Sequence, residues 1–537
     1  MARARTATKK KTKRKKTKKE QPLTTAQQLG SLIKSARDIM RKDKGLNGDL
    51  DRLPMLTWIM FLKFLDDMEQ LGEQEASLGK KKYRPVIDAP YRWRDWAAQE
   101  DGITGDELIA FVNQEVATRP DGTEGPGLIA YLRSLQSASG RSRREVVARV
   151  FEGVYNRMVS GYLLRDVINK VNGIHFTSSE ELHTLSRLYE SMLKEMRDAA
   201  GDSGEFYTPR PVVQFMVAAT NPQLGEAVLD PACGTGGFLN EAFEHLSKQV
   251  KTTADRQTLQ EASIHGQEAK PLPYMLAQMN LLLHGLEYPD VTYGNSLARK
   301  VTEIGDSERV DVLLTNPPFG GEEEAGIKSN FPADKQTSET ALLFLQLIMR
   351  LLKRPEKNNG VPGRAAVVVP NGMLFGDGVC ARIKEDLLKH FNLHTIVRLP
   401  NGVFAPYTLI PTNLLFFDRS GPTKHIWYYE IPLPEGRKNY TKTKPMRVEE
   451  FADCIKWFGN SRRQLNDRAW KVAVDDVLQY SDDGNLLSAN LDVKNPNSEE
   501  ALEHLPPKQL AEDILEKERQ IIGILEEVTA ELEGARV

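Results

Sequence analysis

Cysteine is scarce in this chain, which contains only Cys233, Cys380 and Cys454 among its 537 residues. Because these three are widely spaced and form no CxxC pair, the sequence excludes a disulfide framework and a cysteine zinc site. Long hydrophobic runs are also missing, so we expect no membrane-spanning helix. The basic N-terminus is not followed by an apolar segment, so we do not interpret it as a secretory signal. We expect a cytoplasmic protein without a metal site.

The chain has little net charge, −2 in total, but the two signs are distributed unevenly. Residues 1–20 contain eleven lysines and arginines and one glutamate, a charge of +10, which leaves −12 for residues 21–537. Such a run cannot bury itself in a core, so we predict a disordered basic tail over residues 1–20. Two interpretations of the tail stay open: a solubilising segment, and an arm that contacts DNA phosphates. If the acidic remainder handles DNA, we expect a partner to supply much of the contact with the phosphate backbone.

The length predicts two to four domains. Between Thr25 and Asn172 the pattern is helical, because apolar residues recur at spacings of three and four. They occur at Leu29, Leu32, Ile33, Ala36, Ile39 and Met40, and again at Trp58, Ile59, Phe61, Leu62 and Leu65. We therefore predict an N-terminal all-helical domain over residues 21–172.

Residues 173–480 have a different texture, in which short apolar runs end in turn residues and alternate with helical stretches. The predicted strands are Ala227–Asp230, Ser263–Gln267, Val291–Gly294, Val310–Thr315, Ala365–Pro370, His394–Leu399, Asn413–Phe417 and His425–Tyr429. Near-continuous apolar strands separated by helices predict an α/β domain with a mostly parallel sheet covered on both faces. Ligands of such sheets bind beyond the carboxyl ends of the strands.

After Phe417 we expect only a strand or two, a short polar stretch and a long terminal helix, with no separate domain for target recognition. Within the predicted C-terminal helical segment, residues 481–537, an apolar stripe repeats every seven residues at Ile514, Ile521 and Val528. We interpret this stripe as a partner-binding surface. A helix that folds back on its own domain remains the alternative.

A glycine-rich turn, DPACGTGG over residues 230–237, follows the first predicted strand. Glycines let the backbone approach a ligand closely, and the turn lacks the Gly-Lys-Ser/Thr of a nucleoside triphosphate loop. Taken alone, the turn is either a nucleotide-binding turn or a purely structural one. Glu268 follows the next strand, at a position where doubly wound folds bind ribose hydroxyls, although a surface glutamate is the alternative.

The tetrapeptide Asn316-Pro317-Pro318-Phe319 stands at the end of the fourth predicted strand. The two prolines cannot continue strand pairing, so they hold the chain rigid with its carbonyl groups exposed. The Asn316 side-chain oxygen and the Pro317 carbonyl can accept both hydrogens of an exocyclic amine, and Phe319 offers a flat face for stacking a base. An ordinary Pro-Pro loop is the alternative for an isolated motif of this kind.

Together, DPACGTGGF and NPPF resemble the class I methyltransferase fold in its amino-methyltransferase branch, with the motif order of the gamma arrangement. Three further segments, GEFYTPR (204–210), PNGVF (400–404) and PTNLLFF (411–417), resemble the methylation subunit of type I restriction-modification systems. The likeness covers nearly all of residues 25–535.

The resemblance implies a role for each matching residue. The catalytic residues are Asn316, Pro317, Pro318 and Phe319, and the S-adenosylmethionine site comprises Phe206, Tyr207, Thr208, Asp230, Gly234, Thr235, Gly236, Glu268, Asn295 and Asn316. Glu268 is expected to hold the ribose. Asn295 stands where the family often has Asp near the cofactor adenine, and we expect that contact to survive the exchange.

The implied activity is transfer of a methyl group from S-adenosylmethionine to N6 of an adenine flipped out of double-stranded DNA. The implied partners are a specificity subunit, a second copy of this chain and, where restriction occurs, a restriction and translocase subunit. The sequence lacks a Walker A lysine motif, so ATP-driven translocation belongs to another chain. The rival functions are methylation of a protein glutamine or an RNA base, and a catalytically silent DNA-binding or scaffold protein.

Overall fold

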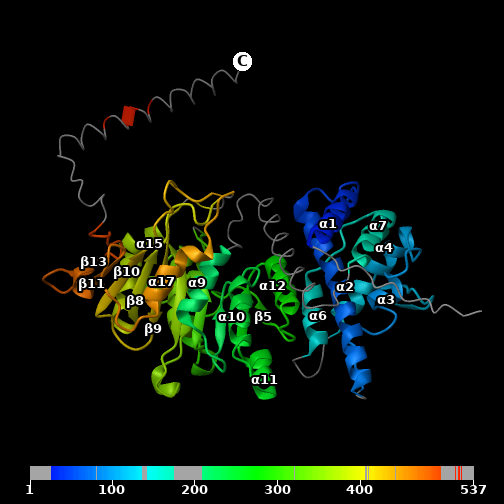
Figure 1. The fold of residues 1–537 in the computed structure, drawn as a ribbon, viewed down its shortest axis with the longest axis horizontal. Coiled ribbons are helices and arrows are strands. Elements are labelled where there is room, and N and C mark those ends of the chain that lie inside the picture. Colours follow the sequence, from blue (N-terminus) through cyan, green and yellow to red (C-terminus); the bar gives the residue numbers. More distant parts are fainter. Residues whose placement is uncertain are drawn as a thin grey trace, which may run out of the picture. The chain divides into compact units, whose positions relative to one another are not determined.

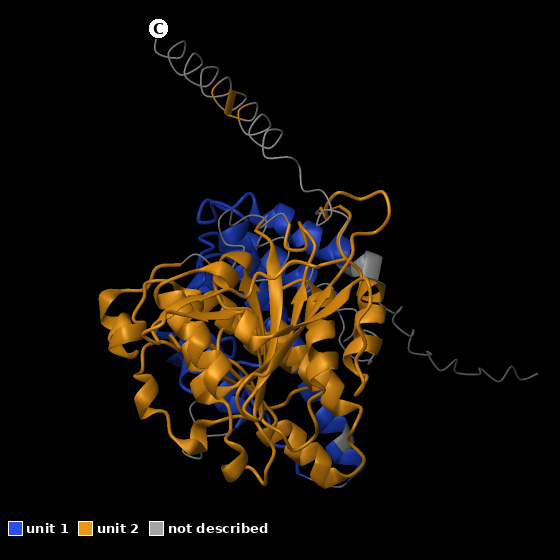
Figure 2. Cartoon of the chain, turned by 90° about the vertical axis from the view of Figure 1, so that its left-hand side faces the viewer, with its two compact units in different colours: residues 1–199 blue, residues 200–537 orange. Residues whose placement is uncertain are grey.

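The computed structural model describes residues 26–79, 82–135, 142–174, 208–319, 321–405, 408, 410–441 and 443–497, and four positions between 515 and 522 (Figure 1). They belong to two compact units, residues 1–199 and 200–537, which Figure 2 shows in different colours. The predicted basic tail, the cofactor-side residues Phe206 and Tyr207, and the apolar stripe of the terminal helix lie outside the described residues.

Unit 1 is largely helical, as the apolar spacing predicts. Its described helices are α1 (Ala26–Met40), α2 (Asp49–Leu78), α3 (Trp93–Trp96), α4 (Gly105–Asn113), α5 (Leu128–Arg133), α6 (Arg143–Glu152) and α7 (Gly161–Asn172). A short antiparallel pair of strands, β1 (Val116–Thr118) and β2 (Glu124–Pro126), interrupts them. The sequence analysis did not predict this pair, since three-residue strands carry too little periodicity to stand out.

Two helices of unit 1 meet at glycines. Gly161 begins α7 and Gly105 begins α4, and a Cβ atom at Gly161 would lie 1.8 Å from the carbonyl oxygen of Gly105. The chain just before α7 is anchored by the buried carboxylate of Asp43, which accepts the backbone N–H groups of Val159 (3.2 Å) and Ser160 (2.9 Å). The first turn of α7 is therefore held in a fixed position with no space for a side chain.

Unit 2 is built on a nine-stranded sheet in the order β11-β10-β8-β9-β7-β6-β3-β4-β5. The strands are β3 (Val228–Asp230), β4 (Ile264–Glu268), β5 (Asp290–Tyr293), β6 (Val312–Thr315), β7 (Arg364–Pro370), β8 (Asn392–Arg398), β9 (Thr412–Asp418), β10 (His425–Glu430) and β11 (Ala469–Ala473). Five of the eight neighbouring pairs are parallel, and β9 runs antiparallel between β7 and β8. The α/β fold with a mostly parallel sheet is confirmed.

Alternating side chains along the strands supply two separate cores. In β6, Val312 and Leu314 belong to one core, whereas Leu313 belongs to the other. The first core is completed by α9 (Arg210–Thr220), α10 (Gly237–Ser247), α11 (Thr253–Ala262), α12 (Pro271–Leu283) and α17 (Ala452–Phe458), and the second by α14 (Thr340–Leu351), α15 (Asn371–Phe375) and α16 (Val379–His390). Helices thus cover both faces, which explains why β6 is apolar at consecutive positions.

The strand order reverses between β3 and β6. The chain proceeds from β3 outward to β4 and β5, then returns to pair β6 with the other side of β3, where Val228 lies opposite Val312. The carboxyl ends of β3, β4, β5 and β6 therefore meet along one edge, at the topological switch point where such sheets bind ligands. Asp230, Glu268 and Asn316 stand at or directly after these ends.

The region after Phe417 holds more regular structure than the sequence analysis predicted. Besides β10 it contains α17, the edge strand β11 and a hairpin of β12 (Leu478–Tyr480) and β13 (Leu486–Ala489). The expectation of only a strand or two was wrong, because short, partly exposed strands interrupted by polar residues leave little apolar pattern. The hairpin spans the expected boundary between residues 480 and 481. Beyond it, Asn495 Nδ2 donates a hydrogen bond to the Asp467 carbonyl (2.8 Å), so the chain contacts the α/β domain as far as Asn495.

All three cysteines are buried and unpaired. Within the described parts of both units, no helix is both long enough and apolar enough to span a bilayer.

We expect Gly161→Ala to destabilise the protein by about 3 kcal/mol or more, because its methyl group has no position clear of the Gly105 carbonyl. Gly30→Ala is the matched control: Gly30 lies inside α1 with nothing within 4 Å of an added Cβ, so it should gain up to about 1 kcal/mol in helix propensity. Chemical denaturation of the full chain, followed by circular dichroism, measures both. Equal stabilities for the two variants would contradict the close contact.

Candidate active site

Glycines shape the turn between β3 and α10. Gly234 and Gly236 have φ angles of 54° and 80°, in the left-handed region that favours glycine. The Gly236 N–H donates to the Cys233 carbonyl (2.8 Å), and the Thr235 carbonyl accepts a hydrogen bond from Asn280 Nδ2 (2.9 Å). The residues expected to approach the cofactor therefore form a turn whose backbone is fixed from both sides.

The carboxylate of Glu268 joins this turn to the end of β4. One oxygen accepts the Gly234 N–H (2.9 Å) and the other accepts the Lys270 N–H (2.8 Å). Glu268 is 7% exposed, and burial raises the pKa of its carboxyl group. Each carboxylate oxygen has a second lone pair, so Glu268 can hold the turn and still accept a hydroxyl hydrogen from a ligand.

Asp230 ends β3 as a fully buried acid with 1% exposure. Burial raises the pKa of its carboxyl group to about 7, against the opposing effects of the neighbouring Thr315 hydroxyl and of the Ala232 N–H, which donates to Asp230 Oδ1 (3.1 Å). The nearby Glu268 carboxylate raises the pKa further. A positive charge close to this end of the sheet would stabilise the ionised form of both acids.

Asn316 presents an unsatisfied acceptor. Its Nδ2 donates to the Thr208 hydroxyl (3.1 Å), which fixes the amide and directs Oδ1 away from Thr208. Among the described residues, Asn316 Oδ1 is a buried oxygen that receives no hydrogen bond. A buried acceptor without a partner costs free energy, so this atom is suited to a donor that a ligand brings.

Phe319 stands three residues further on, partly buried against the core. Its ring meets Phe404 edge to face, with centroids 6.5 Å apart. Phe404 belongs to the PNGVF segment, so two of the segments that carry the family resemblance meet here. The edge contact supports the ring of Phe319 without covering both of its faces.

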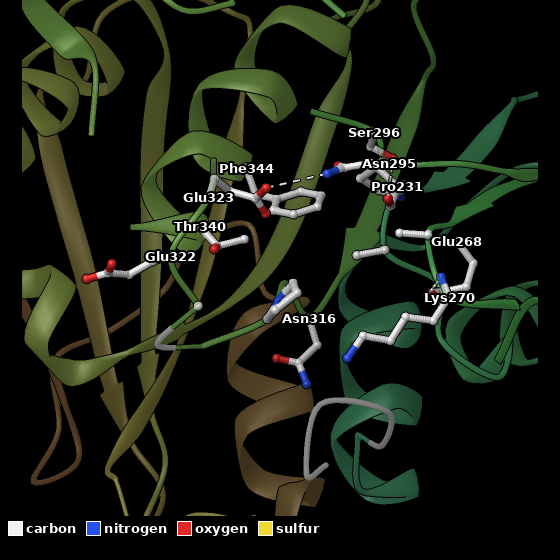
Figure 3. A pocket seen from close by; sticks show the side chains of 14 residues that line it. Pro231, Glu268, Lys270, Asn295, Ser296, Asn316, Glu322, Glu323, Thr340 and Phe344 are labelled. Atoms are coloured by element: carbon white, nitrogen blue, oxygen red, sulfur yellow. Dashed lines mark hydrogen bonds between the residues drawn. The ribbon is translucent and has the colours of Figure 1, made fainter. Parts of the chain in front are cut away.

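A cavity of about 280 Å³ opens at the carboxyl ends of the strands (Figure 3). Among its charged lining residues, Glu268, Glu322 and Glu323 are acidic and Lys270 is basic. This excess of carboxylates suits a ligand with cationic groups, such as the sulfonium and ammonium of S-adenosylmethionine. The unsatisfied Asn316 oxygen and the free lone pairs of Glu268 supply the acceptors that an amine and a ribose require. The residues present therefore fit the expected cofactor.

Four of the predicted residues line this cavity: Glu268, Asn295, Asn316 and Pro318. The remaining described ones, Thr208, Asp230, Gly234, Thr235, Gly236, Pro317 and Phe319, form its surroundings rather than its lining. The sequence analysis missed Lys270, Glu323, Thr340 and Phe344, which also line the cavity. Thr340 and Phe344 lie one helical turn apart at the start of α14. That spacing was the only sequence pattern that could have suggested a shared surface.

We expect cofactor-free Asp230→Asn to melt roughly 2 to 6 °C above the wild type at pH 8. In the folded protein the pKa of Asp230 is raised from 3.8 to about 7, so ionisation of this acid destabilises the fold as pH rises through that interval. Asparagine has no proton to lose, so the advantage should shrink at pH 5. Differential scanning fluorimetry measures the difference in melting temperature, with Asp482→Asn, at an exposed position, as the control. A difference that does not depend on pH would contradict the raised pKa.

Two family models match the chain. The model described as N-6 DNA Methylase matches residues 180–501, and the model described as HsdM N-terminal domain matches residues 29–171. The chain is 47% identical over 521 residues to the EcoEI methylase subunit of a type I restriction enzyme from Escherichia coli, covering 94% of this chain and 99% of that protein. It is 29% identical over 392 residues to the EcoKI methylase subunit from Escherichia coli K12, covering 68% and 69%.

Solved structures agree. A protein from Vibrio vulnificus YJ016, described as a modification subunit of a type I restriction enzyme, is 70% identical with a TM-score of 0.86, covering 90% of this chain and all of that one. A chain from a structure of type I restriction-modification complex assembly is 41% identical with a TM-score of 0.70, covering 95% and 99%. None of these relatives supports methylation of protein or RNA. The chain belongs to the N-6 DNA methylase family as a type I methylase subunit, an adenine-specific DNA methyltransferase that uses S-adenosylmethionine.

Proposed function

We propose that Asn316, Pro317, Pro318 and Phe319 form the catalytic centre. The observation that carries this proposal is the buried Oδ1 atom of Asn316, which receives no hydrogen bond from the described residues. Asn316 follows directly after β6, and it lines the cavity that fits the cofactor. An exocyclic amine would satisfy it, and the Pro317 carbonyl would accept the second hydrogen of the same amine.

In this proposal the residues act by positioning and by polarisation. S-adenosylmethionine supplies an electrophilic methyl group on a sulfonium that leaves as a neutral thioether. The two acceptors hold the adenine amino group and stabilise the positive charge that grows on its nitrogen as the new N–C bond forms. The nitrogen then loses one proton to solvent water, which leaves a neutral methylated amine. Thr208 orients the Asn316 amide, and Phe319 stacks on the flipped base, which must leave the duplex to reach this site.

The proposed cofactor site comprises residues from five segments of the chain. Asp230, Gly234, Thr235 and Gly236 would approach the methionine part, Glu268 the ribose and Asn295 the adenine, with Thr208 and Asn316 next to the cofactor. Phe206 and Tyr207, which lie outside the described residues, stay predicted cofactor contacts. The hydrogen bond between Glu268 and the Gly234 N–H supports the first two assignments, since it joins the turn directly to the acid.

We expect Asn316→Ala to lower DNA methylation at least about 100-fold, because it removes an acceptor that acts on charge developing in the transition state. The dissociation constant for S-adenosylmethionine should change less than about threefold. Incorporation of labelled methyl groups measures the first, and isothermal titration calorimetry the second. A folded variant that loses cofactor binding and methylation to the same extent would contradict the catalytic assignment.

We further propose that the chain acts within a complex in the cytoplasm, where a specificity subunit chooses the DNA sequence. The partners are that subunit, a second copy of this chain, a restriction subunit where cleavage occurs, and double-stranded DNA with a flipped adenine. The net charge of −12 over residues 21–537 supports this, since such a body repels DNA phosphates and needs a partner for the backbone contacts. The similarity to a chain from a type I complex-assembly structure supports it as well.

The isolated chain should bind S-adenosylmethionine. Its methylation of DNA should be at least about 100-fold lower than after a specificity subunit is added. The reason is the repulsion between an acidic body and DNA, which a basic partner surface overcomes. Labelled methyl incorporation with and without the specificity subunit tests this. Sequence-specific methylation by the chain alone would contradict it.

A further inference from the structure

We infer that Glu323 determines specificity for the cofactor's base, by accepting a hydrogen bond from the 6-amino group of the adenine in S-adenosylmethionine. This inference deepens the cofactor site proposed above and rests on it. The starting observation is that Glu323 lines the cavity beside Asn295, at the end of the segment that begins with the catalytic tetrapeptide.

Asn295 is already committed to protein contacts. Its Oδ1 accepts the Leu297 N–H (2.9 Å), and its Nδ2 donates to Glu323 Oε2 (3.4 Å), the bond drawn in Figure 3. The Asn295 oxygen keeps one lone pair that can contact the base, but its amide nitrogen is directed at Glu323 and positions that carboxylate. On this wall the charged acceptor is Glu323, and the Asn295 amide orients its carboxylate. Asparagine at this position therefore does not leave the base without an acceptor.

The segment that carries Glu323 is held in place. The Glu323 N–H donates to the Ser338 carbonyl (3.0 Å), and the Thr340 N–H donates to the Gly321 carbonyl (3.2 Å). A Cβ atom at Gly321 would lie 2.8 Å from the Thr340 hydroxyl, so the segment packs closely on the start of α14. The carboxylate is thus presented from a fixed backbone, as recognition of a single amino group requires.

The residues that line this part of the cavity favour a purine. Glu268, the proposed ribose ligand, ends β4, and Asn295 follows β5, the next strand along the same edge. A nucleoside held by its ribose at Glu268 would extend its base along this wall. Phe344, which is 5% exposed, presents its ring to the cavity close to both Asn295 and Glu323 (Figure 3). Pro318 also lines the cavity and adds a further apolar surface. Flat apolar surfaces with one charged acceptor suit an aromatic base that bears an amino group.

A carboxylate also rejects a base that has an oxygen in place of the amino group. Hypoxanthine presents a 6-oxo acceptor, which cannot bond Glu323 and would place two acceptors against each other. Sites built to bond one polar group discriminate strongly against an analogue that lacks it. Glutamine at position 323 would remove this discrimination, because its amide can donate to the 6-oxo group and can still accept from a 6-amino group.

The test compares binding of S-adenosylhomocysteine with its 6-oxo analogue, S-inosylhomocysteine, to the full chain by isothermal titration calorimetry. We expect the wild type to prefer the adenine ligand at least about 30-fold and Glu323→Gln to prefer it no more than about 3-fold. Glu324→Gln removes the same charge from the adjacent exposed residue, which does not line the cavity, and should keep the wild-type preference.

Three results would overturn the inference: an unchanged preference in Glu323→Gln, an equal loss of affinity for both ligands, or the same change of preference in Glu324→Gln. Failure of the wild type to bind S-adenosylhomocysteine at all would instead refute the proposed cofactor site, and the inference with it. The two failures are therefore distinguishable.

Discussion

The contact between the Glu268 carboxylate and the Gly234 N–H, 2.9 Å long, joins the two parts of the chain on which the cofactor site depends. One part is a turn that needs left-handed glycines, and the other is the end of the neighbouring strand. Without an acid here the turn would have a buried N–H group with no acceptor. The same carboxylate also lines the cavity, so in the proposed site one side chain both shapes the backbone and receives the ligand.

Electrostatics and unsatisfied hydrogen-bonding groups explain why the site is selective. Asp230 and Glu268 are buried acids whose pKa values are raised by burial, and Asn316 carries an acceptor without a described partner. Each of these features reduces the stability of the empty protein. In the proposed reaction, the positive charge and ribose hydroxyls of the cofactor would offset the cost at the two acids, and the amino group of the target adenine would offset the cost at Asn316.

The sequence predicted the central strands well and the short strands after β10 poorly. Strands β3 and β6 are buried on both faces, so hydrophobicity marks them directly, whereas β12 is mostly exposed and has no such signal. For the site, glycine and proline conformations made the turn and the tetrapeptide recognisable from local sequence. The contact of Asn316 with Thr208 joins residues 108 positions apart, and Glu323 and Phe344 reach the cavity only through the packing of α14. Such contacts depend on tertiary structure, and no local pattern encodes them.

The burial of the three cysteines has a consequence for the chemical durability of the enzyme. Burial raises the pKa of the Cys380 thiol to about 11 and also raises those of Cys233 and Cys454 well above the usual value. Oxidants and alkylating agents react with the thiolate, and at neutral pH almost none is present at any of the three positions. Cys233 lies within the glycine-rich turn, so its low reactivity closes one route by which oxidation could damage the proposed cofactor site.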